Sequence, residues 1–224
     1  MKDAVTSLGL WRVRDIVYSC SLPKLFMGTK QGMPPETFWR HALGTALISQ
    51  HLGQRLSAES QDRLYLAGLL HDIGILVNAL LFPAEFVEVM GIAATTETPL
   101  CEVEQTALGF SHCESGRILA DIWKLPAQIA DVIEFHHHPS TKGEAAEMIA
   151  IVHLADELCR VRGLGYGYYE AREFDLASEP AWHLLAGRYP ATADVDMARF
   201  TFELDAECVQ VSALVDSILG ARPN

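Results

Sequence analysis

Residues 66–81 read LAGLLHDIGILVNALL and place an adjacent histidine and aspartate, His71 and Asp72, inside an otherwise apolar stretch. An ionised carboxylate in such surroundings is costly unless hydrogen bonds or a cation compensate its charge. Imidazole and carboxylate groups are both natural ligands of transition metals. The stretch therefore raises the question of whether the rest of the chain supplies more ligands of this kind.

The composition is that of a folded globular protein, since 50% of the 224 residues are apolar and 21% are charged. The net charge of −12 argues against non-specific nucleic-acid binding, which needs clustered positive charge. The N-terminal residues hold no apolar signal-peptide core, and the five widely spaced cysteines are typical of reduced thiols, mostly buried. We therefore expect a cytoplasmic protein that does not enter a membrane.

The hydrophobic residues recur with helical rather than alternating spacing along nearly the whole chain. Residues 64–82 are long enough to span a bilayer, but polar residues interrupt them, so two buried helices that meet at a break are expected. Gly74 is expected to end the first of these in a left-handed conformation. Ser111 and Glu114 have the spacing of a capping box before the helix that starts at His112. Helices are expected over residues 3–8, 10–18, 35–56, 59–72, 75–81, 84–94, 99–108, 112–123, 126–136, 144–162, 177–187 and 196–219. The predicted fold is all-α, a single compact multi-helix domain over residues 1–224, with the helices of 177–219 packed onto it.

Further histidines and aspartates lie on separate predicted helices. A single histidine in a helix is usually structural or exposed, and we take His51, His153 and His183 as such. The run of three histidines at 136–138 ends a helix, where a cationic histidine is favoured without any metal. Together, however, the candidates follow one order along the chain: His41, His71-Asp72, His112, His136-His137 and Asp156.

This order resembles the HD-domain metal-dependent phosphohydrolase superfamily, and in detail its HDOD branch, the HD-related output domain of bacterial signalling. The segments that carry the resemblance are FWRHAL (38–43), LAGLLHDIG (66–74), FSH (110–112), WKLP (123–126), IEFHHHP (133–139) and VHLAD (152–156). It covers about residues 4–165. The resemblance implies a helical HD-type fold.

The resemblance also implies one or two divalent transition metal ions, Fe, Mn, Zn or Ni, in a single pocket. Asp72 would bridge two ions and, in an active relative, act in catalysis by helping to hold a metal-bound water. The ligands implied by the resemblance are His41, His71, Asp72, His112, His136, His137 and Asp156.

Three positions depart from catalytically active relatives of the HD-GYP phosphodiesterase type. Ile75 stands where those relatives have a lysine suited to meet substrate phosphate. Thr37 stands where they have a glutamate one turn before the first histidine, and Glu36 is out of register by about 100°. Their GYP signature is missing, and Gly165-Tyr166 lies after Asp156, in the wrong place to substitute for it.

Family members usually carry several helices before the position that Val5 occupies here, so the protein is either naturally short or a truncated product. A missing helical layer would expose apolar surface near Trp11 and Val13 and favour self-association as a homo-oligomer.

Three hypotheses for function follow. The first is a signalling output or regulatory domain with a His/Asp metal pocket and weak or no catalysis, which binds a signalling protein or a nucleotide-like ligand. The second is a metal-dependent phosphohydrolase that acts on a nucleotide or cyclic dinucleotide. The third is a helical scaffold with hydrogen-bonded core histidines and no metal. Ile75 favours the first over the second.

Overall fold

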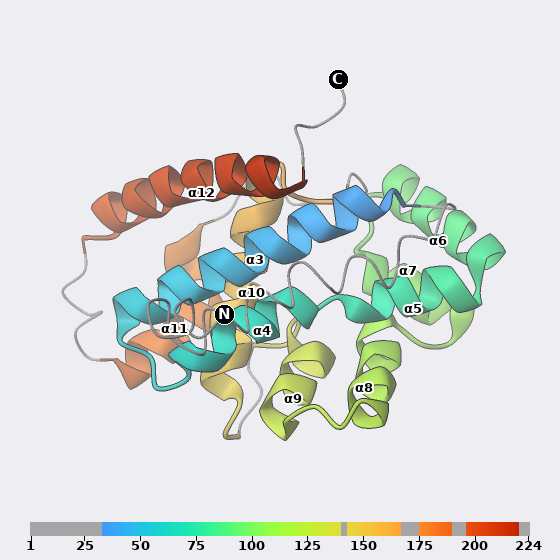
Figure 1. Cartoon of the computed structure of the whole chain (residues 1–224), viewed down its shortest axis with the longest axis horizontal. Coiled ribbons are helices and arrows are strands. Elements are labelled where there is room, and N and C mark those ends of the chain that lie inside the picture. The colour runs from blue at the N-terminus through green and yellow to red at the C-terminus, as the bar shows by residue number, and fades with distance from the viewer. Residues whose placement is uncertain (1–32, 140–142, 167–174, 190–195, 220–224) are drawn as a thin grey trace, which may run out of the picture.

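The computed structural model describes residues 33–139, 143–166, 175–189 and 196–219, and Figure 1 shows their arrangement. These residues form helices and one short 3-10 turn, with no strand among them. The all-α single domain is therefore confirmed. The helices are α3 (Pro35–Leu56), α4 (Gln61–Leu70), α5 (Ile73–Leu81), α6 (Pro83–Thr96), α7 (Leu100–Leu108), α8 (His112–Ile122), α9 (Ala127–Phe135), α10 (Ala146–Val161), α11 (Pro180–Arg188) and α12 (Met197–Leu219).

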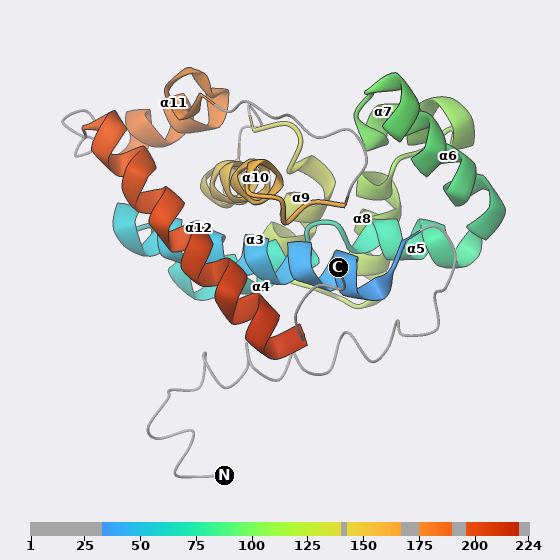
Figure 2. The same ribbon diagram turned by 90° about the horizontal axis from the view of Figure 1, so that it is seen from above.

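The long helix α3 lies at the centre of the packing. Pro35 begins it, where a missing backbone N–H costs nothing, and Ser57 ends it in a left-handed conformation with φ 54°. It packs against α4, α10 and α12, and Figure 2 shows α12 crossing it. One face of α3 is buried, and its members are Phe38, Ala42, Thr45, Ser49 and Leu52. His41 also lies in α3 and is fully buried.

The apolar stretch forms two helices rather than one. Helix α4 ends at Leu70 and α5 begins at Ile73, so His71 and Asp72 occupy the break between them. Residues Arg63–Leu81 are long and apolar enough to cross a membrane, but 83% of the apolar window is buried inside the protein. The stretch is thus a core element of this domain. The two helices that meet at a break are confirmed, but the break lies at residues 71–72 and not at 73–74, where the expected helices 59–72 and 75–81 placed it.

The expectation for Gly74 is wrong. Gly74 is the second residue of α5 and is absent from the described residues with positive φ. A Cβ atom there would lie 1.8 Å from the carbonyl oxygen of His112 and 2.7 Å from the amide nitrogen of Gly116. Glycine is therefore needed because the backbones of α5 and α8 touch, and not because a helix ends there.

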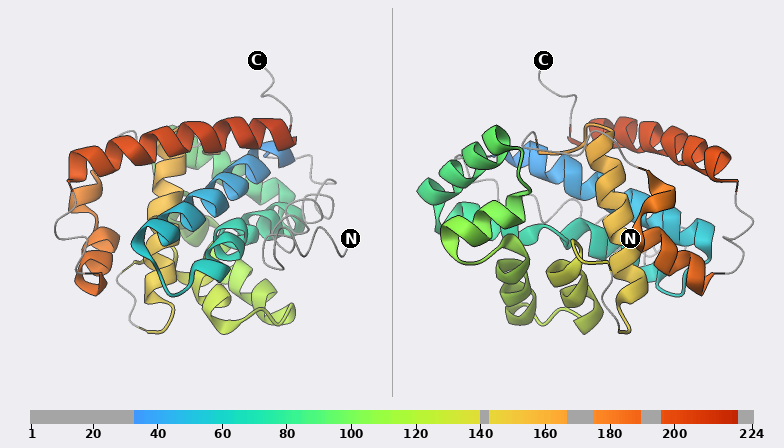
Figure 3. Two further views of the ribbon diagram at one scale, coloured as in Figure 1. Left: turned by 60° about the vertical axis from the view of Figure 1, so that its left-hand side comes forward. Right: turned by 180° about the vertical axis from the view of Figure 1, so that it is seen from behind.

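Helices α8 and α9 pack side by side on the side of the domain away from α12 (Figure 3). Helix α9 also contacts α4 and α10. The capping interaction at the start of α8 is present, because the backbone N–H of Ser111 donates to the Glu114 carboxylate at 2.9 Å. This interaction fixes the first turn of α8, which begins with His112.

The C-terminal helices α11 and α12 pack against α10 and α3 respectively. The helix expected over 177–187 begins later, at Pro180, because a proline fits the first turn and not the interior of a helix. Residues Leu176–Ser178 form a separate 3-10 turn. The helices expected over 3–8 and 10–18, and the apolar surface expected near Trp11 and Val13, lie outside the described residues.

Candidate metal centre

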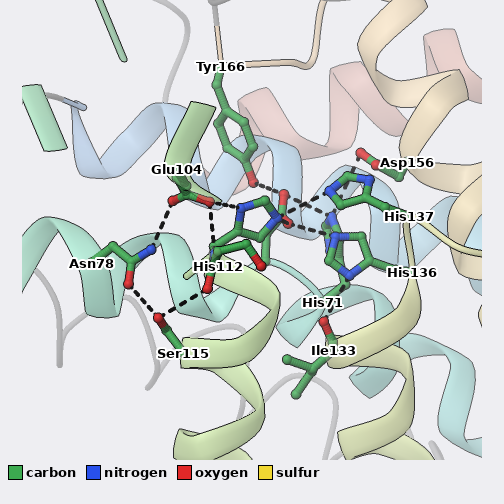
Figure 4. Close-up of polar contacts among 12 residues, drawn as sticks. His71, Asn78, Glu104, His112, Ser115, Ile133, His136, His137, Asp156 and Tyr166 are labelled. Carbon is green, nitrogen blue, oxygen red and sulfur yellow. Dashed lines mark hydrogen bonds and ion pairs between the residues drawn. The ribbon is translucent and has the colours of Figure 1, made fainter. Parts of the chain in front are cut away.

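The structure brings the seven predicted ligands into one pocket. His41 comes from the middle of α3, His71 and Asp72 from the α4–α5 break, and His112 from the first residue of α8. The other three follow α9 or lie within α10: His136, His137 and Asp156. All are buried except His137, which is half-buried. Figure 4 shows how the labelled histidine rings gather beside Asp156.

One ring nitrogen of each fully buried histidine is already engaged by an acceptor. The Nδ1 atoms of His41, His71 and His136 lie 2.9, 2.7 and 3.0 Å from the backbone carbonyl oxygens of Leu164, Gly68 and Ile133 respectively. A carbonyl oxygen can only accept a hydrogen bond, so each Nδ1 carries the proton. When such a ring is neutral, its Nε2 atom carries no proton and presents a lone pair.

The Nε2 atoms of His71 and His136 point at Asp72, whereas Nε2 of His41 lies nearer to Asp156, 2.9 Å from its Oδ1. Asp72 faces four imidazoles. Its Oδ1 lies 3.1 Å from His136 Nε2 and 3.3 Å from His112 Nε2. Its Oδ2 lies 3.2 Å from His71 Nε2 and 3.7 Å from His41 Nε2. The two oxygens of Asp72 therefore face different histidine pairs.

Several of these atoms have no hydrogen-bond partner, although they are buried: Nε2 of His41, His71 and His136, and Oδ1 of Asp72. Buried polar atoms are seldom left unsatisfied, because each costs about 1–3 kcal/mol. Lone pairs that face carboxylate oxygens require a cation between them or protons on the rings. The donor set thus fits a metal ion.

The donor atoms divide into two groups, each within a span of 4.8 Å. The first group holds His41, His71, Asp72 and Asp156, and the second holds His112, Cys113, His136 and His137. In the second group, Nε2 of His112 and Nε2 of His137 lie 3.2 Å apart. Asp72 stands between the groups, which suits a bridging carboxylate.

His112 is oriented by a residue that the sequence did not suggest. Glu104 of α7 is fully buried and lies 2.6 Å from His112 Nδ1, and it also accepts from the His112 backbone N–H at 2.8 Å. Asn78 donates to Glu104 at 2.9 Å, and Ser115 donates to Asn78 at 2.6 Å (Figure 4). A carboxylate behind a histidine ligand fixes its tautomer and strengthens it as a metal ligand.

Two further side chains reach the carboxylates. The Tyr166 hydroxyl donates to Asp72 Oδ2 at 2.9 Å, a contact that the sequence did not suggest. Nε of Arg160 donates to Asp156 Oδ1 at 2.8 Å. The Tyr166 contact shows that a residue ten positions after Asp156 returns to the pocket, because the chain turns back after α10.

The electrostatics of the pocket favour a cation. Burial alone raises the pKa of the Asp72 carboxyl, but the surrounding imidazoles lower that pKa well below its ordinary value. Burial lowers the pKa of His71, yet Asp72 and Asp156 outweigh it and raise that pKa to about 10. Burial and neighbouring imidazoles leave the pKa of His136 and of His137 below its ordinary value. The carboxylates are therefore ionised while these two imidazoles are neutral.

A cavity of about 720 Å³ lies beside the pocket, and His137, Cys113 and Arg160 are among its lining residues. None of the six fully buried ligands lines it. Ile75, where active relatives have lysine, is fully buried in the apolar core, and Thr37 is half-buried on α3. The phosphate-binding lysine expected of active relatives thus has no counterpart at that position.

The histidines taken as structural lie outside both groups of donor atoms. Nδ1 of His153 lies 2.9 Å from the backbone carbonyl oxygen of His136, so it holds the segment after α9 against α10. His183 is exposed on α11.

A family model described as the HDOD domain matches residues 1–139, which is more than half of the chain. The chain belongs to the HDOD family. An HDOD domain protein of unknown function from Geobacter sulfurreducens is 31% identical, with a TM-score of 0.86 over 97% of this chain and 74% of that one. This likeness and the family match confirm the resemblance drawn from the motifs.

Two other similar proteins differ more from this HDOD chain. A protein from Shewanella amazonensis, named as a candidate phosphohydrolase, is 20% identical, with a TM-score of 0.73 over 98% of this chain and 76% of that one, which shows the fold alone. An uncharacterized protein of Treponema pallidum is 26% identical over 166 residues. Those residues are 71% of this chain and 31% of the Treponema protein, so the chain spans about a third of that protein's length.

Proposed function

We propose that this HDOD chain is an output or regulatory domain of bacterial signalling whose pocket holds one or two divalent transition metal ions. A signalling protein or a nucleotide-like ligand is its proposed partner, in the cytoplasm. The observation that supports the metal most directly is the set of buried Nε2 atoms of His41, His71 and His136 that lie near Asp72 and have no hydrogen-bond partner. Fe, Mn, Zn and Ni all accept such a set of imidazoles and carboxylates.

The scaffold hypothesis explains this geometry less well. In a pocket held by hydrogen bonds alone, each Nε2 would point its proton at an acceptor. Here the three Nδ1 atoms face backbone carbonyls, so Nε2 can donate only if the ring is charged. The carboxylates favour that charge on His71, whose pKa is raised to about 10, but burial and neighbouring imidazoles lower the pKa of His136 and work against it there. A bound cation satisfies all three rings at once.

A regulatory role is favoured over catalysis by access and by charge. The first group of ligands is sealed from solvent, because His41, His71, Asp72 and Asp156 are each no more than 1% exposed. The cavity reaches only the second group, through His137 and Cys113. With Ile75 in the core, the described residues offer no lysine at the position that would meet a phosphate.

The test is the metal content of untagged protein by elemental analysis. We expect one or two transition metal ions per chain, and a loss of metal in Asp72→Ala. His183→Ala, which removes an exposed histidine, is the matched control and should keep the metal. Protein that contains no transition metal and cannot be loaded with Mn, Fe or Zn would refute the proposal. Thermal melts with and without a chelator give a second readout, because an ion bound only to the folded state raises its stability.

A second candidate function is a metal-dependent phosphohydrolase. The observation that favours it is the cavity, where Arg160 lines the wall and contacts Asp156. In this case a bound ion would supply a water of lowered pKa as nucleophile, and Asp72 would position the ligands around it. Hydrolysis of a nucleotide or cyclic dinucleotide that is abolished in Asp72→Ala would establish this function and exclude the purely regulatory one.

A further inference from the structure

Cys113 stands among the second group of donor atoms. It is the second residue of α8, directly after His112, and it is 7% exposed. Its Sγ and one nitrogen from each of His112, His136 and His137 all lie within 4.8 Å of one another. Cys113 also lines the 720 Å³ cavity.

The histidines of this group bring nitrogen atoms together at a spacing that suits a tetrahedral ion. Nδ1 of His112 is bound to Glu104, and Nδ1 of His136 is bound to the backbone carbonyl oxygen of Ile133. The remaining Nε2 of His136 is buried without a hydrogen-bond partner. Nε2 of His112 and Nε2 of His137 are 3.2 Å apart. Two nitrogen ligands at the usual zinc distance would be about 3.3 Å apart in a tetrahedron.

We infer that Cys113 supplies a thiolate ligand to an ion held by His112, His136 and His137. This inference rests on the proposed metal centre and concerns the second ion only. It makes the two sites chemically different, because the first group offers two imidazoles and two carboxylates and the second offers three imidazoles and a thiolate. Thiolate favours softer ions such as Zn²⁺, so the second site prefers zinc over manganese, and the first site is the harder one.

The simpler interpretation of Cys113 is a small buried apolar residue. Two features argue against it. The thiol lies at the first turn of an eleven-residue helix, where negative charge is favoured. Its Sγ also lies close to three imidazoles, and the residue lines the cavity. Cys101 provides the comparison, because it lines the same cavity and belongs to neither group of donor atoms.

The test is a cobalt titration of the metal-stripped protein, followed by ultraviolet and visible absorption. Thiolate coordination to Co²⁺ gives an intense charge-transfer band in the near ultraviolet, whereas imidazole and carboxylate ligands give only the weaker visible bands. We expect the charge-transfer band in the wild type and its loss in Cys113→Ser. The matched control, Cys101→Ser, should keep the band at full intensity.

The outcomes separate this inference from the proposed function. Visible cobalt bands without a charge-transfer band would overturn the thiolate ligand and leave the metal centre intact. A charge-transfer band that survives in Cys113→Ser would also overturn it, because another thiol would then be the ligand. Protein that binds no cobalt at all would overturn both proposals. Circular dichroism of Cys113→Ser confirms that a lost band reflects the ligand and not unfolding.

Discussion

Replacement of Gly74 by alanine tests the packing on which the pocket depends. The new Cβ would lie 1.8 Å from the carbonyl oxygen of His112 and 2.7 Å from the amide nitrogen of Gly116. Contacts below 3.0 Å essentially never occur for real Cβ atoms, so the first turn of α8 would have to move by roughly 1 Å. The obstacle is backbone, which no change of rotamer can relieve.

The expected change in the free energy of unfolding is the sum of two opposing effects. Overpacking costs about 1–3 kcal/mol, and a collision with backbone belongs at the upper end of that range. Alanine in a helix recovers about 1 kcal/mol relative to glycine. We therefore expect Gly74→Ala to lower the free energy of unfolding by about 2 kcal/mol. For a chain of this size that lowers Tm by about 4–8 °C.

The assay is thermal and urea unfolding of metal-free protein, with Gly91→Ala as the control. Gly91 lies within α6, and no atom would lie within 4 Å of its added Cβ. The same chemical change should there raise stability by about 0.5–1 kcal/mol. If Gly74→Ala is as stable as the wild type, or behaves like Gly91→Ala, the contact between α5 and α8 does not exist as described.

Three further predictions concern single side chains. Glu104→Gln should weaken metal binding about 10–100-fold, because His112 loses its anionic partner. Equilibrium dialysis with zinc measures the affinity, and an unchanged affinity would contradict the prediction. Tyr166→Phe should lower the free energy of unfolding of the metal-free protein by about 1.5–3 kcal/mol, because ionised Asp72 loses a hydrogen bond. An unchanged midpoint of urea unfolding would refute that contact. Glu147 accepts from Ser60, Tyr189 and Arg188, and although burial alone raises its pKa, these bonds lower it below its ordinary value. A lowered carboxyl pKa stabilises the folded state above the unfolded pKa of about 4.3, and this contribution is lost as the pH falls through the folded pKa. Glu147→Gln should therefore be less stable than wild type at pH 7, and the difference should vanish in urea melts at lower pH; a constant difference would refute it.

The sequence predicted the helices well where local signals specify them. Pro35 at the first turn of α3 and the pair Ser111 and Glu114 before α8 are short-range features, and both helices begin where these signals place them. A break in the apolar stretch was also predicted from its polar residues, although it lies at His71-Asp72, two residues earlier than expected. The membership of the pocket came from the order of motifs along the chain.

What the sequence did not predict depends on contacts between distant segments. Gly74 carries a local signal for a helix end, and only the approach of α8 reveals its actual role. Glu104 looks like an ordinary surface glutamate of α7 until the fold places it against His112. Tyr166 reaches Asp72 across 94 positions in the chain. Asn78 gave the one available hint, because an amide within an apolar helix needs a partner.

The two groups of donor atoms have very different spans along the chain. Those of the second group lie between His112 and His137, on or beside the neighbouring helices α8 and α9. Those of the first group extend from His41 to Asp156 and require α3, the α4–α5 break and α10 to be in place together. Contacts between distant segments form late, because a long loop must first be closed. We therefore expect the second site to form before the first during folding. An ion bound there would hold α8 against the segment after α9 before α10 has packed.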